Sequence, residues 1–320
     1  MNAELIQLPL VEPFRIAHGS SSHRVMLRVE HDGLRVEVPF VPYYNDDPLE
    51  ALQTIQRMTS PDGELAANAP RQVVLVCDLL RHSMQARAAG MPVWSLLKLP
   101  DPNGVRGCRS IGIPEDMCTF RQRVAELAAQ FRVIKLKLGT RSLAFDLAIV
   151  ASAREAAPDA TLLVDANGGW SVANAASIIP QLAAFGVEAV EQPVNHRMGI
   201  REWTKLRAAL PEPGVCLIAD ESVQRAEGVA PLAGLAGGIN VKLLKCGGIG
   251  GALRMMEMAR QHQMKVMLGC MIETQSGIGH AAQLAGLADW IDLDGHFYLP
   301  DEGLGTVRYD ENGALRLVPD

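Results

Sequence analysis

The chain has 320 residues, more than one small domain needs, and this length suits a parallel α/β barrel of about 250 residues with a smaller domain beside it. Hydrophobic residues make up 48% and charged residues 21%, as in an ordinary globular protein, and a net charge of -6 gives no general attraction to nucleic acid or to anionic membranes. We see neither a signal peptide nor an apolar run long enough to cross a bilayer, and the six cysteines contain no C-x-x-C pair, so we expect a cytoplasmic protein with reduced cysteines.

A small α+β domain is predicted for residues 1–104. Strand-like runs at 25–30 and 34–38 are separated by the turn signal Asp32-Gly33. Helical patterns follow at 48–58 and 71–89. A loop rich in proline and glycine closes this region at 99–104 and marks a domain boundary.

Beyond this loop the chain becomes regular and predicts a parallel barrel over residues 105–299. Apolar strand candidates recur at 109–113, 133–138, 162–165, 189–191, 217–220, 240–243, 266–269 and 290–294. Several segments between them, such as 120–131 and 144–157, are rich in alanine and favour helices. Eight strands alternating with helices favour a barrel. A doubly wound open sheet is the alternative, weakened because the chain has no glycine-rich dinucleotide-binding motif and no P-loop.

Charged residues stand where the predicted strands end, which is where barrel enzymes place their active sites. Three acids occur there on successive strands: Asp165, Glu191 and Asp220. Crowded like charges require a cation, and oxygen donors that leave room for water and substrate suit Mg²⁺, whereas zinc would prefer His or Cys. The alternative is that each acid caps the helix that follows it, which is less favoured for three in succession.

Lysines form a second group at the same strand ends. Lys135 and Lys137 are two residues apart, so both side chains leave one side of a strand, and the apolar residues around them argue against a solvated surface strand. Neighbouring cations lower the pKa of an ammonium group, which would make a lysine a better general base at neutral pH. Lys242 lies on the sixth predicted strand, across the barrel from the second. One base on each face of a planar carbanion would allow 1,1-proton transfer, and hence racemisation or epimerisation.

Five motifs carry a resemblance to a known family: K-x-K at 135–137, D-A-N at 165–167, E-Q-P at 191–193, A-D-E-S at 219–222 and N-x-K-x-x-K-x-G-G at 240–248. In this order and spacing they resemble the muconate-lactonising-enzyme subgroup of the enolase superfamily. The resemblance covers nearly the whole chain and implies a modified TIM barrel, (β/α)7β, with an N-terminal α+β capping domain on which the tail at 300–320 packs back. It also implies a domain-closing helix over 88–99, and association into a homo-oligomer is typical of such barrels.

The resemblance implies a role for each charged residue of the strand ends. Three acids match ligands of Mg²⁺, the implied cofactor: Asp165, Glu191 and Asp220. Lys137 and Lys242 match the two acid/base lysines, and Lys135 stands beside the first as an electrostatic neighbour within reach of the substrate. Three further residues match groups that support the site without reacting: Asn167, Asn240 and Lys245.

Finer features select a branch of the subgroup. G-C-M-I-E at 269–273 and D-L-D-G at 292–295 resemble dipeptide epimerases, in which a D-x-D pair holds the free ammonium of the substrate. Two carboxylates on one side of a strand end suit a cation, although a salt-bridged strand end is the alternative. The residues expected to contact a small-molecule substrate are Asp292, Asp294, Glu273 and, in a polar flap that also contains His18, Arg24.

We therefore predict an isomerase, a Mg²⁺-dependent dipeptide epimerase that inverts the α-carbon of the C-terminal residue through an enediolate. Muconate cycloisomerase, o-succinylbenzoate synthase and N-acylamino acid racemase share the metal and the lysines and remain the alternatives within the subgroup. A non-catalytic barrel that serves as a binding module is a third reading.

Departures from the family pattern leave the specificity open. The cap is shorter than usual and lacks the common G-E-x-x-P stretch at 36–40, and Gln275 and His296 stand where serine and proline are typical. The glycine run at 247–251 could cradle a phosphate at a helix start, but a tight turn between strand and helix is the favoured interpretation.

Overall fold

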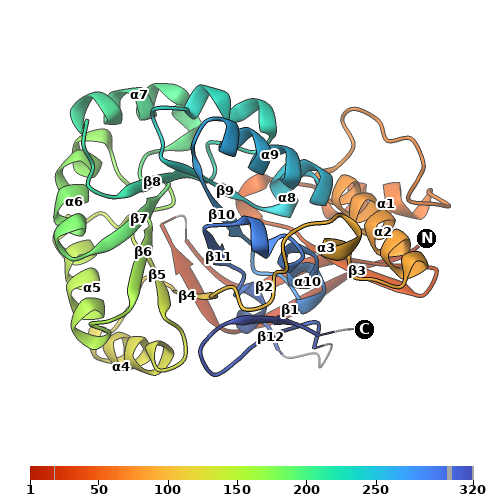
Figure 1. Ribbon diagram of the computed structural model, residues 1–320, viewed down its shortest axis with the longest axis horizontal. Helices are drawn as coiled ribbons and strands as arrows, with labels where there is room; N and C mark the ends of the chain where they lie inside the picture. Colours follow the sequence, from red (N-terminus) through yellow and green to blue (C-terminus); the bar gives the residue numbers. More distant parts are fainter. Residues whose placement is uncertain (18, 301–304, 319–320) are drawn as a thin grey trace.

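The computed structural model describes residues 1–17, 19–300 and 305–318 (Figure 1). An antiparallel sheet begins the chain, in the order β1 (Asn2–Ile16), β2 (Gly19–His31) and β3 (Leu34–Pro39). The strands predicted at 25–30 and 34–38 are confirmed as parts of β2 and β3. The sequence did not predict β1, because this edge strand has no fully buried residue and is interrupted by Pro9 and Pro13.

Three helices complete the N-terminal domain: α1 (Pro48–Gln56), α2 (Arg71–Ala89) and α3 (Val93–Leu96). The helix predicted at 71–89 is confirmed, and the one at 48–58 is confirmed to within two residues. The continuous helix expected over 88–99 is wrong. Gly90 ends α2 in the left-handed conformation, at φ 62°, and only the four residues of α3 are helical beyond it.

Among the described residues, eight parallel strands form one sheet whose order follows the chain from β4 to β11. They are β4 (Cys108–Ile111), β5 (Val133–Lys137), β6 (Thr161–Asp165), β7 (Val187–Glu191), β8 (Cys216–Ala219), β9 (Gly238–Val241), β10 (Lys265–Gly269) and β11 (Trp290–Asp292). A parallel bridge between Gly107 and Ile291 brings the two edges together. The sheet is therefore a nearly closed barrel, as predicted, and the open-sheet alternative is excluded.

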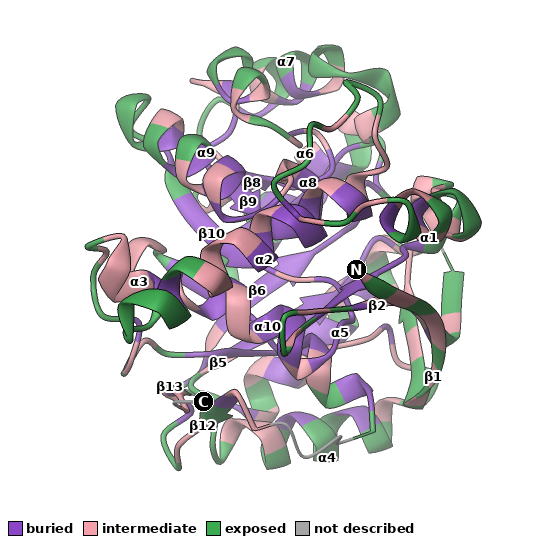
Figure 2. Ribbon diagram, turned by 90° about the vertical axis from the view of Figure 1, so that its right-hand side faces the viewer, coloured by how far each residue is buried: buried purple, intermediate pink, exposed green. Residues whose placement is uncertain are grey.

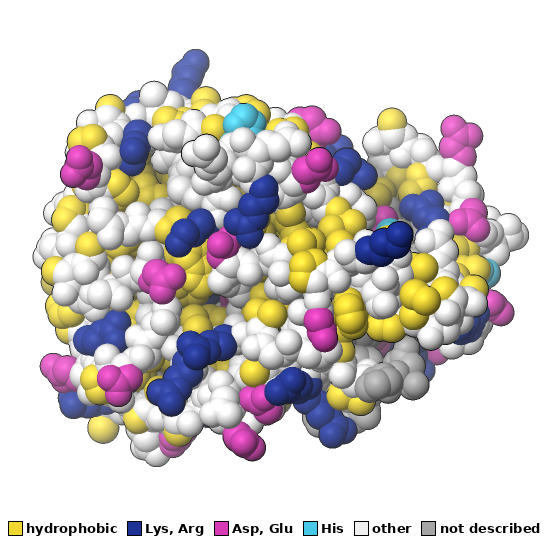
Figure 3. Space-filling model, viewed as in Figure 1, with side chains coloured by type: hydrophobic (Ala, Val, Ile, Leu, Met, Phe, Trp, Pro, Cys, Tyr) yellow, Lys and Arg dark blue, Asp and Glu magenta, His cyan; other side chains and the backbone are white. Residues whose placement is uncertain are grey.

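Helices surround this barrel on the outside (Figure 1). They are α4 (Met117–Ala128), α5 (Leu143–Ala156), α6 (Val172–Ala184), α7 (Ile200–Ala209), α8 (Leu243–Cys246), α9 (Ile249–Gln261) and α10 (Gln275–Ala282). The strands are largely buried and the outer helix faces exposed (Figure 2). On the face shown in Figure 3, acidic and basic side chains are interspersed. In the described part of the chain, no helix combines the length and the apolar character that a membrane span requires.

The barrel interior has an apolar floor beneath a polar layer. The floor consists of one residue from each of six strands: Cys108, Leu163, Ala189, Ile218, Met267 and Trp290. Side chains on one face of a strand are two residues apart, so the next interior positions are Ser110, Asp165, Glu191, Asp220, Gly269 and Asp292. The polar groups at the strand ends therefore continue the register that forms the core.

The described part of the tail, 305–318, forms an antiparallel hairpin of β12 (Val307–Tyr309) and β13 (Leu315–Leu317). Leu315 bonds with the boundary segment, accepting from Gly104 N at 2.9 Å and donating to Val105 O at 2.8 Å. Tyr309 Oη donates to Leu293 O at 3.2 Å. The tail was expected to pack on the capping domain. In its described part, these bonds attach it to the domain boundary and the barrel. Residues 301–304 and 319–320 lie outside the described part of the chain.

Candidate active site

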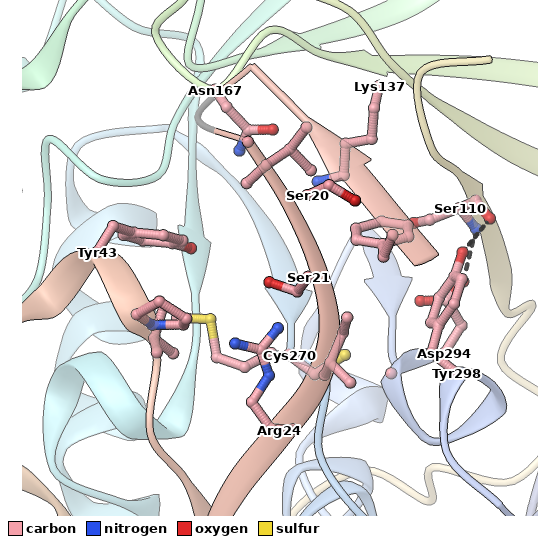
Figure 4. Close-up of a pocket in the computed structure, with 18 of the residues that line it drawn as sticks. Ser20, Ser21, Arg24, Tyr43, Ser110, Lys137, Asn167, Cys270, Asp294 and Tyr298 are labelled. Carbon is pink, nitrogen blue, oxygen red and sulfur yellow. Dashed lines mark hydrogen bonds between the residues drawn. The ribbon is translucent and has the colours of Figure 1, made fainter. Parts of the chain in front are cut away.

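A cavity of about 310 Å³ lies between the N-terminal sheet and the carboxyl ends of the barrel strands (Figure 4). The N-terminal domain contributes one wall, from β1, β2 and the segment that follows β3: Phe14, Ile16, Gly19, Ser20, Ser21, Arg24, Val41, Pro42 and Tyr43. The barrel contributes the polar groups of the opposite wall, among them Ser110, Lys137, Asn167, Lys242, Asp292 and Asp294. A ligand bound there would therefore contact both the N-terminal domain and the barrel.

Two lysines from separate parts of the barrel reach the cavity, each held by its own carboxylate. Lys137, the last residue of β5, has its Nζ 2.6 Å from Asp165 Oδ2. Lys242, which directly follows β9, has its Nζ 2.7 Å from Asp220 Oδ2. Burial lowers the pKa of Lys242, but the charges of Asp220 and Glu191, with smaller contributions from other nearby groups, together hold that pKa well above its ordinary value.

Lys135 lies one interior position below Lys137 and does not reach the cavity. Its side chain is fully buried, with Nζ 2.6 Å from Glu191 Oε2 and 2.5 Å from Asp292 Oδ2. Burial alone would lower the pKa of Lys135, but Asp292 and Glu191 raise it well above the ordinary value. The nearest charged neighbours of Lys135 Nζ are thus carboxylates, whereas a second ammonium group and a divalent cation were considered from the sequence.

The three acids predicted as metal ligands lie side by side at the strand ends. Asp165 and Glu191 are register partners on β6 and β7, and Asp220 follows the last residue of β8. Burial, together with the charge of Asp165, raises the pKa of Glu191 to about 7. Burial acts in the same direction on Asp220, but Lys242 and Lys245 outweigh it and hold its pKa well below the usual range.

The donor chemistry of this group fits a hard cation. In the described residues, no three His, Cys, Asp or Glu side chains surround a common point as metal ligands would, and each of the three acids is paired with a lysine. Two buried acceptor oxygens beside them, Asn167 Oδ1 and Glu221 Oε2, have no hydrogen-bond partner. Unsatisfied buried acceptors and carboxylates on three neighbouring strands suit an ion such as Mg²⁺ that binds oxygen and keeps some of its water.

The predicted supporting residues hold the acids in place. Asn167 donates its backbone N–H to Asp165 Oδ1 at 2.8 Å and its side-chain amide to Glu221 Oε1 at 3.2 Å. Asn240 donates from Nδ2 to Glu191 Oε1 at 2.8 Å. Lys245 Nζ contacts the carboxylate of Asp220 and donates to its backbone oxygen at 2.7 Å, so it anchors the acid without reaching the cavity.

Gln192 was quoted within the E-Q-P motif but assigned no role. Its Oε1 accepts from Asp220 N at 3.0 Å and from Ser222 N at 3.1 Å. Its Nε2 donates to Val194 O at 2.7 Å. Gln192 thus fixes the turn that carries Asp220.

Asp292 and Asp294 both line the cavity, and a single residue of β4 holds them. Ser110 donates its N–H to Asp294 Oδ2 at 2.6 Å and its hydroxyl to Asp292 Oδ1 at 3.0 Å. Its carbonyl accepts from Tyr298 Oη, and Figure 4 shows Ser110, Asp294 and Tyr298 together at one end of the cavity. Burial, together with Asp292, raises the pKa of Asp294 to about 6. Ser110 was not predicted from the sequence, although it stands two residues after Cys108 in the interior register.

Arg24 reaches the cavity from β2, and Figure 4 shows its guanidinium directed into the space. Its Nε and Nη1 are buried without a hydrogen-bond partner. Glu273, the other predicted substrate contact, does not line the cavity. Its Oε1 accepts from Met271 N at 3.0 Å, and it packs so closely on Gly277 that a Cβ there would lie 2.3 Å from Oε2. His18 lies outside the described residues.

The glycine run at 247–251 is a turn between two helices. Gly247 ends α8 at φ 81°, and α9 begins at Ile249. The amide of Ile249 donates to Asp78 Oδ2 at 2.6 Å, so a carboxylate of the protein itself occupies the helix start. This contact favours the interpretation of the glycine run as a tight turn and not as a phosphate-binding loop.

Comparison with known proteins identifies relatives of this chain. A family model described as enolase C-terminal domain-like matches residues 119–308. A hydrophobic dipeptide epimerase of Roseobacter litoralis is 36% identical over 254 residues, which cover 78% of this chain and 71% of that protein. An L-Ala-D/L-amino acid epimerase of Pedosphaera parvula is 36% identical over 275 residues, which cover 84% of this chain and 74% of that protein.

Solved structures of related proteins also superpose on nearly the full length of this chain. The dipeptide epimerase of Enterococcus faecalis, solved with Mg and the dipeptide L-Leu-L-Tyr, superposes with a TM-score of 0.82 at 26% identity, covering 99% of this chain and 96% of that one. An enolase family member from Agrobacterium tumefaciens with homology to dipeptide epimerases superposes with a TM-score of 0.83 at 25% identity, covering 99% and 97%.

Proposed function

We propose that this chain, which belongs to the enolase C-terminal domain-like family, is a magnesium-dependent dipeptide epimerase that inverts the α-carbon of the C-terminal residue. The chain is thus an isomerase, as its epimerase relatives are. The observation that carries the proposal is the presence of Lys137 and Lys242 in one cavity, at the ends of strands from different sides of the barrel. Between them lie the acids that would hold the ion.

Asp165, Glu191 and Asp220 would hold the Mg²⁺. When bound, the ion supplies a Lewis acid that binds the substrate carboxylate and stabilises the negative charge of the enediolate. Asn167, Asn240 and Lys245 orient the three acids through the hydrogen bonds described above. Their contribution is to keep the ligands in place before substrate arrives.

The two lysines would exchange protons with the α-carbon from opposite faces. A neutral Nζ of one lysine takes the α-proton, and the electron pair of the C–H bond passes into the enediolate. The ammonium of the other lysine then gives a proton to the opposite face of the same carbon, so the configuration inverts and no atom is gained or lost. In the reverse direction the two lysines exchange roles.

Asp292 and Asp294 would bind the free ammonium of the dipeptide. Both line the cavity, and Ser110 donates a hydrogen bond to each of them. The muconate cycloisomerase, o-succinylbenzoate synthase and N-acylamino acid racemase reactions use substrates without this ammonium. The acidic pair and the epimerase relatives together favour a dipeptide.

Arg24 would set the preferred side chain of that dipeptide. It is a buried cation in the cavity wall whose Nε and Nη1 have no partner. A carboxylate on the substrate would supply the missing acceptors, so we include a dipeptide with an acidic side chain in the proposal.

A heavy-water screen tests the reaction. Mixed L,L-dipeptides are incubated with enzyme and Mg²⁺ in deuterium oxide and followed by mass spectrometry and chiral chromatography. We expect one deuterium at a single α-carbon, with inversion, and acidic dipeptides among the best substrates. If no dipeptide in a broad library exchanges, the dipeptide assignment is wrong, and the same screen with N-acylamino acids tests the nearest alternative.

A further inference from the structure

One contact joins the N-terminal domain to the turn behind Lys242. Asp78 lies on α2, and its side chain is 13% exposed. Its Oδ2 accepts a hydrogen bond of 2.6 Å from the backbone amide of Ile249, the first residue of α9, although the two residues are 171 positions apart. Figures 1 and 2 both place α2 alongside α8 and α9.

The turn is shaped to receive this carboxylate. Gly248 has φ 111°, and a Cβ on it would lie 2.2 Å from Asp78 Oδ2, so a side chain there would displace the acid. A Cβ on the preceding Gly247 would lie 3.1 Å from Val74 Cγ1, one helical turn before Asp78. His82, one helical turn later, has its Nδ1 3.3 Å from the same Oδ2 atom and 2.8 Å from the backbone oxygen of Asp78.

A short, bonded segment connects this turn to Lys242. Lys242 stands directly before α8, and its carbonyl accepts from Cys246 N at 3.3 Å. Leu243 O accepts from both Gly247 N and Gly248 N at 3.0 Å. The segment is thus a closed turn, and a displacement of Ile249 would be passed to the backbone of Lys242. Lys137 lies at the end of β5, on the other side of the barrel from this turn.

We propose that Asp78 is a positioning residue for Lys242, so that the docking of the N-terminal domain and the placement of one proton-transfer lysine depend on the same contact. The proposal rests on the function proposed above. It assigns a role to the glycine run that is not phosphate binding. It also makes the two lysines unequal, because only Lys242 depends on the docking of α2 through Asp78.

The inequality gives a sharp test. Each epimer of a dipeptide substrate is incubated separately in deuterium oxide, and the initial rate of α-deuterium incorporation is measured for the wild type, Lys137→Ala and Lys242→Ala. The two lysine variants show which epimer loses its proton to which lysine. In Asp78→Ala, which removes the acceptor for Ile249 N, we expect exchange of the Lys242-dependent epimer to fall about 10- to 100-fold, the loss expected for a base displaced by about 1 Å, while exchange of the other epimer stays within about twofold.

Ser83→Ala is the matched control. Ser83 Oγ lies 3.0 Å from His280 Nε2 and also joins α2 to the barrel, but at α10 and not at the turn behind Lys242. We expect both exchange rates to stay near the wild type in this variant. Amide hydrogen exchange of the peptide spanning 242–250, measured by mass spectrometry, should increase in Asp78→Ala and not in Ser83→Ala.

The proposal is overturned if Asp78→Ala slows both epimers equally, slows neither, or leaves the amide exchange of 242–250 unchanged. Should Asp78→Ala yield no folded protein, Asp78→Glu retains the charge with a displaced carboxylate and is judged by the same ratio. A wild-type enzyme that exchanges no dipeptide refutes the proposed function instead, and the amide exchange of 242–250 still decides whether Asp78 holds the turn.

Discussion

Lys242 and Asp220 form an ion pair, with Nζ 2.7 Å from Oδ2, that joins one proposed base to one proposed metal ligand. Lys137 and Asp165 form the corresponding pair at 2.6 Å. In both pairs a proposed metal ligand contacts a proposed base, although the pairs come from different strands. The acids that would hold the ion therefore also hold the ammonium groups in position. This coupling means that the ligands and the bases cannot be altered independently.

Removal of one lysine should separate exchange from inversion. In Lys137→Ala or Lys242→Ala, we expect epimerisation to fall by about 100-fold or more, since a positioned acid or base typically contributes that much. The remaining lysine can still remove and return a proton on its own face, so each variant should retain deuterium exchange with one epimer only. Chiral chromatography with mass spectrometry measures both quantities. Equal loss of exchange with both epimers would contradict a two-base mechanism.

Asp294→Asn distinguishes an ammonium site from a salt-bridged strand end. If Asp294 binds the substrate cation, the KM for dipeptides should rise about tenfold or more, equivalent to about 1.4 kcal/mol of lost binding. A dipeptide with an acetylated N-terminus should gain nothing from Asp294 and respond little to the change. If Asp294 serves only its contacts with Arg109 and Ser110, the melting temperature should fall while the KM stays constant.

The sequence predicted the barrel and most of its site because one periodicity carries both. Leu163, Ala189 and Ile218 form part of the apolar floor, and the residues two positions later are the acids. Charged residues in phase with a buried strand are costly unless they serve a site, so they stand out in the sequence.

Other parts of the site could not be predicted from local pattern. Ser110 occupies the same register but carries no charge, so nothing local marks it. The burial of Lys135 beneath the cavity depends on Glu191 and Asp292, which come from other strands. Glu273 lies in a matching motif, yet its side chain packs on Gly277 away from the cavity. The contact between Asp78 and Ile249 exists only once the two domains are docked.

Removal of the ion should abolish the reaction reversibly. Treatment with EDTA is expected to stop α-proton exchange, because it removes the ion that would stabilise the enediolate. Addition of Mg²⁺, which the acids would bind, should restore the exchange. Mg²⁺ should also raise the melting temperature, since a ligand that binds only the folded state stabilises it. In Glu191→Gln both effects should require much more Mg²⁺. Full exchange activity in EDTA-treated, metal-free enzyme would contradict the proposed cofactor.

Arg24→Met tests the proposed preference for an acidic side chain. With a substrate such as L-Ala-L-Glu, we expect kcat/KM to fall roughly 30-fold or more, since loss of one partner of a buried charge pair costs about 2 kcal/mol or more. With L-Ala-L-Gln the same variant should stay within about threefold of the wild type. Arg35→Met, which removes an exposed arginine from the neighbouring strand β3, is the control. A similar loss for both dipeptides would show that Arg24 shapes the cavity without selecting charge.

Glu273 gives the fold a dependence on pH that a neutral side chain should remove. Burial raises the pKa of this carboxyl from 4.5 to about 7, although Met271 N donates to it. Below about pH 4.5 the group is protonated in both the folded and the unfolded chain, so it makes no difference to stability. Between about pH 4.5 and 7 the unfolded chain loses the proton first, folding binds a proton, and stability falls as the pH rises.

Above about pH 7 the loss is complete and amounts to about 3 kcal/mol, from 1.36 kcal/mol for each pH unit between the two pKa values. Glu273→Gln keeps an oxygen that can accept from Met271 N but does not ionise. Its free energy of unfolding, measured in urea, should therefore exceed that of the wild type by more at pH 8 than at pH 5. Glu311→Gln, at an exposed position in the tail, should show no such change with pH. A difference between Glu273→Gln and the wild type that is the same at both pH values would mean that Glu273 ionises in the folded protein as readily as in the unfolded chain.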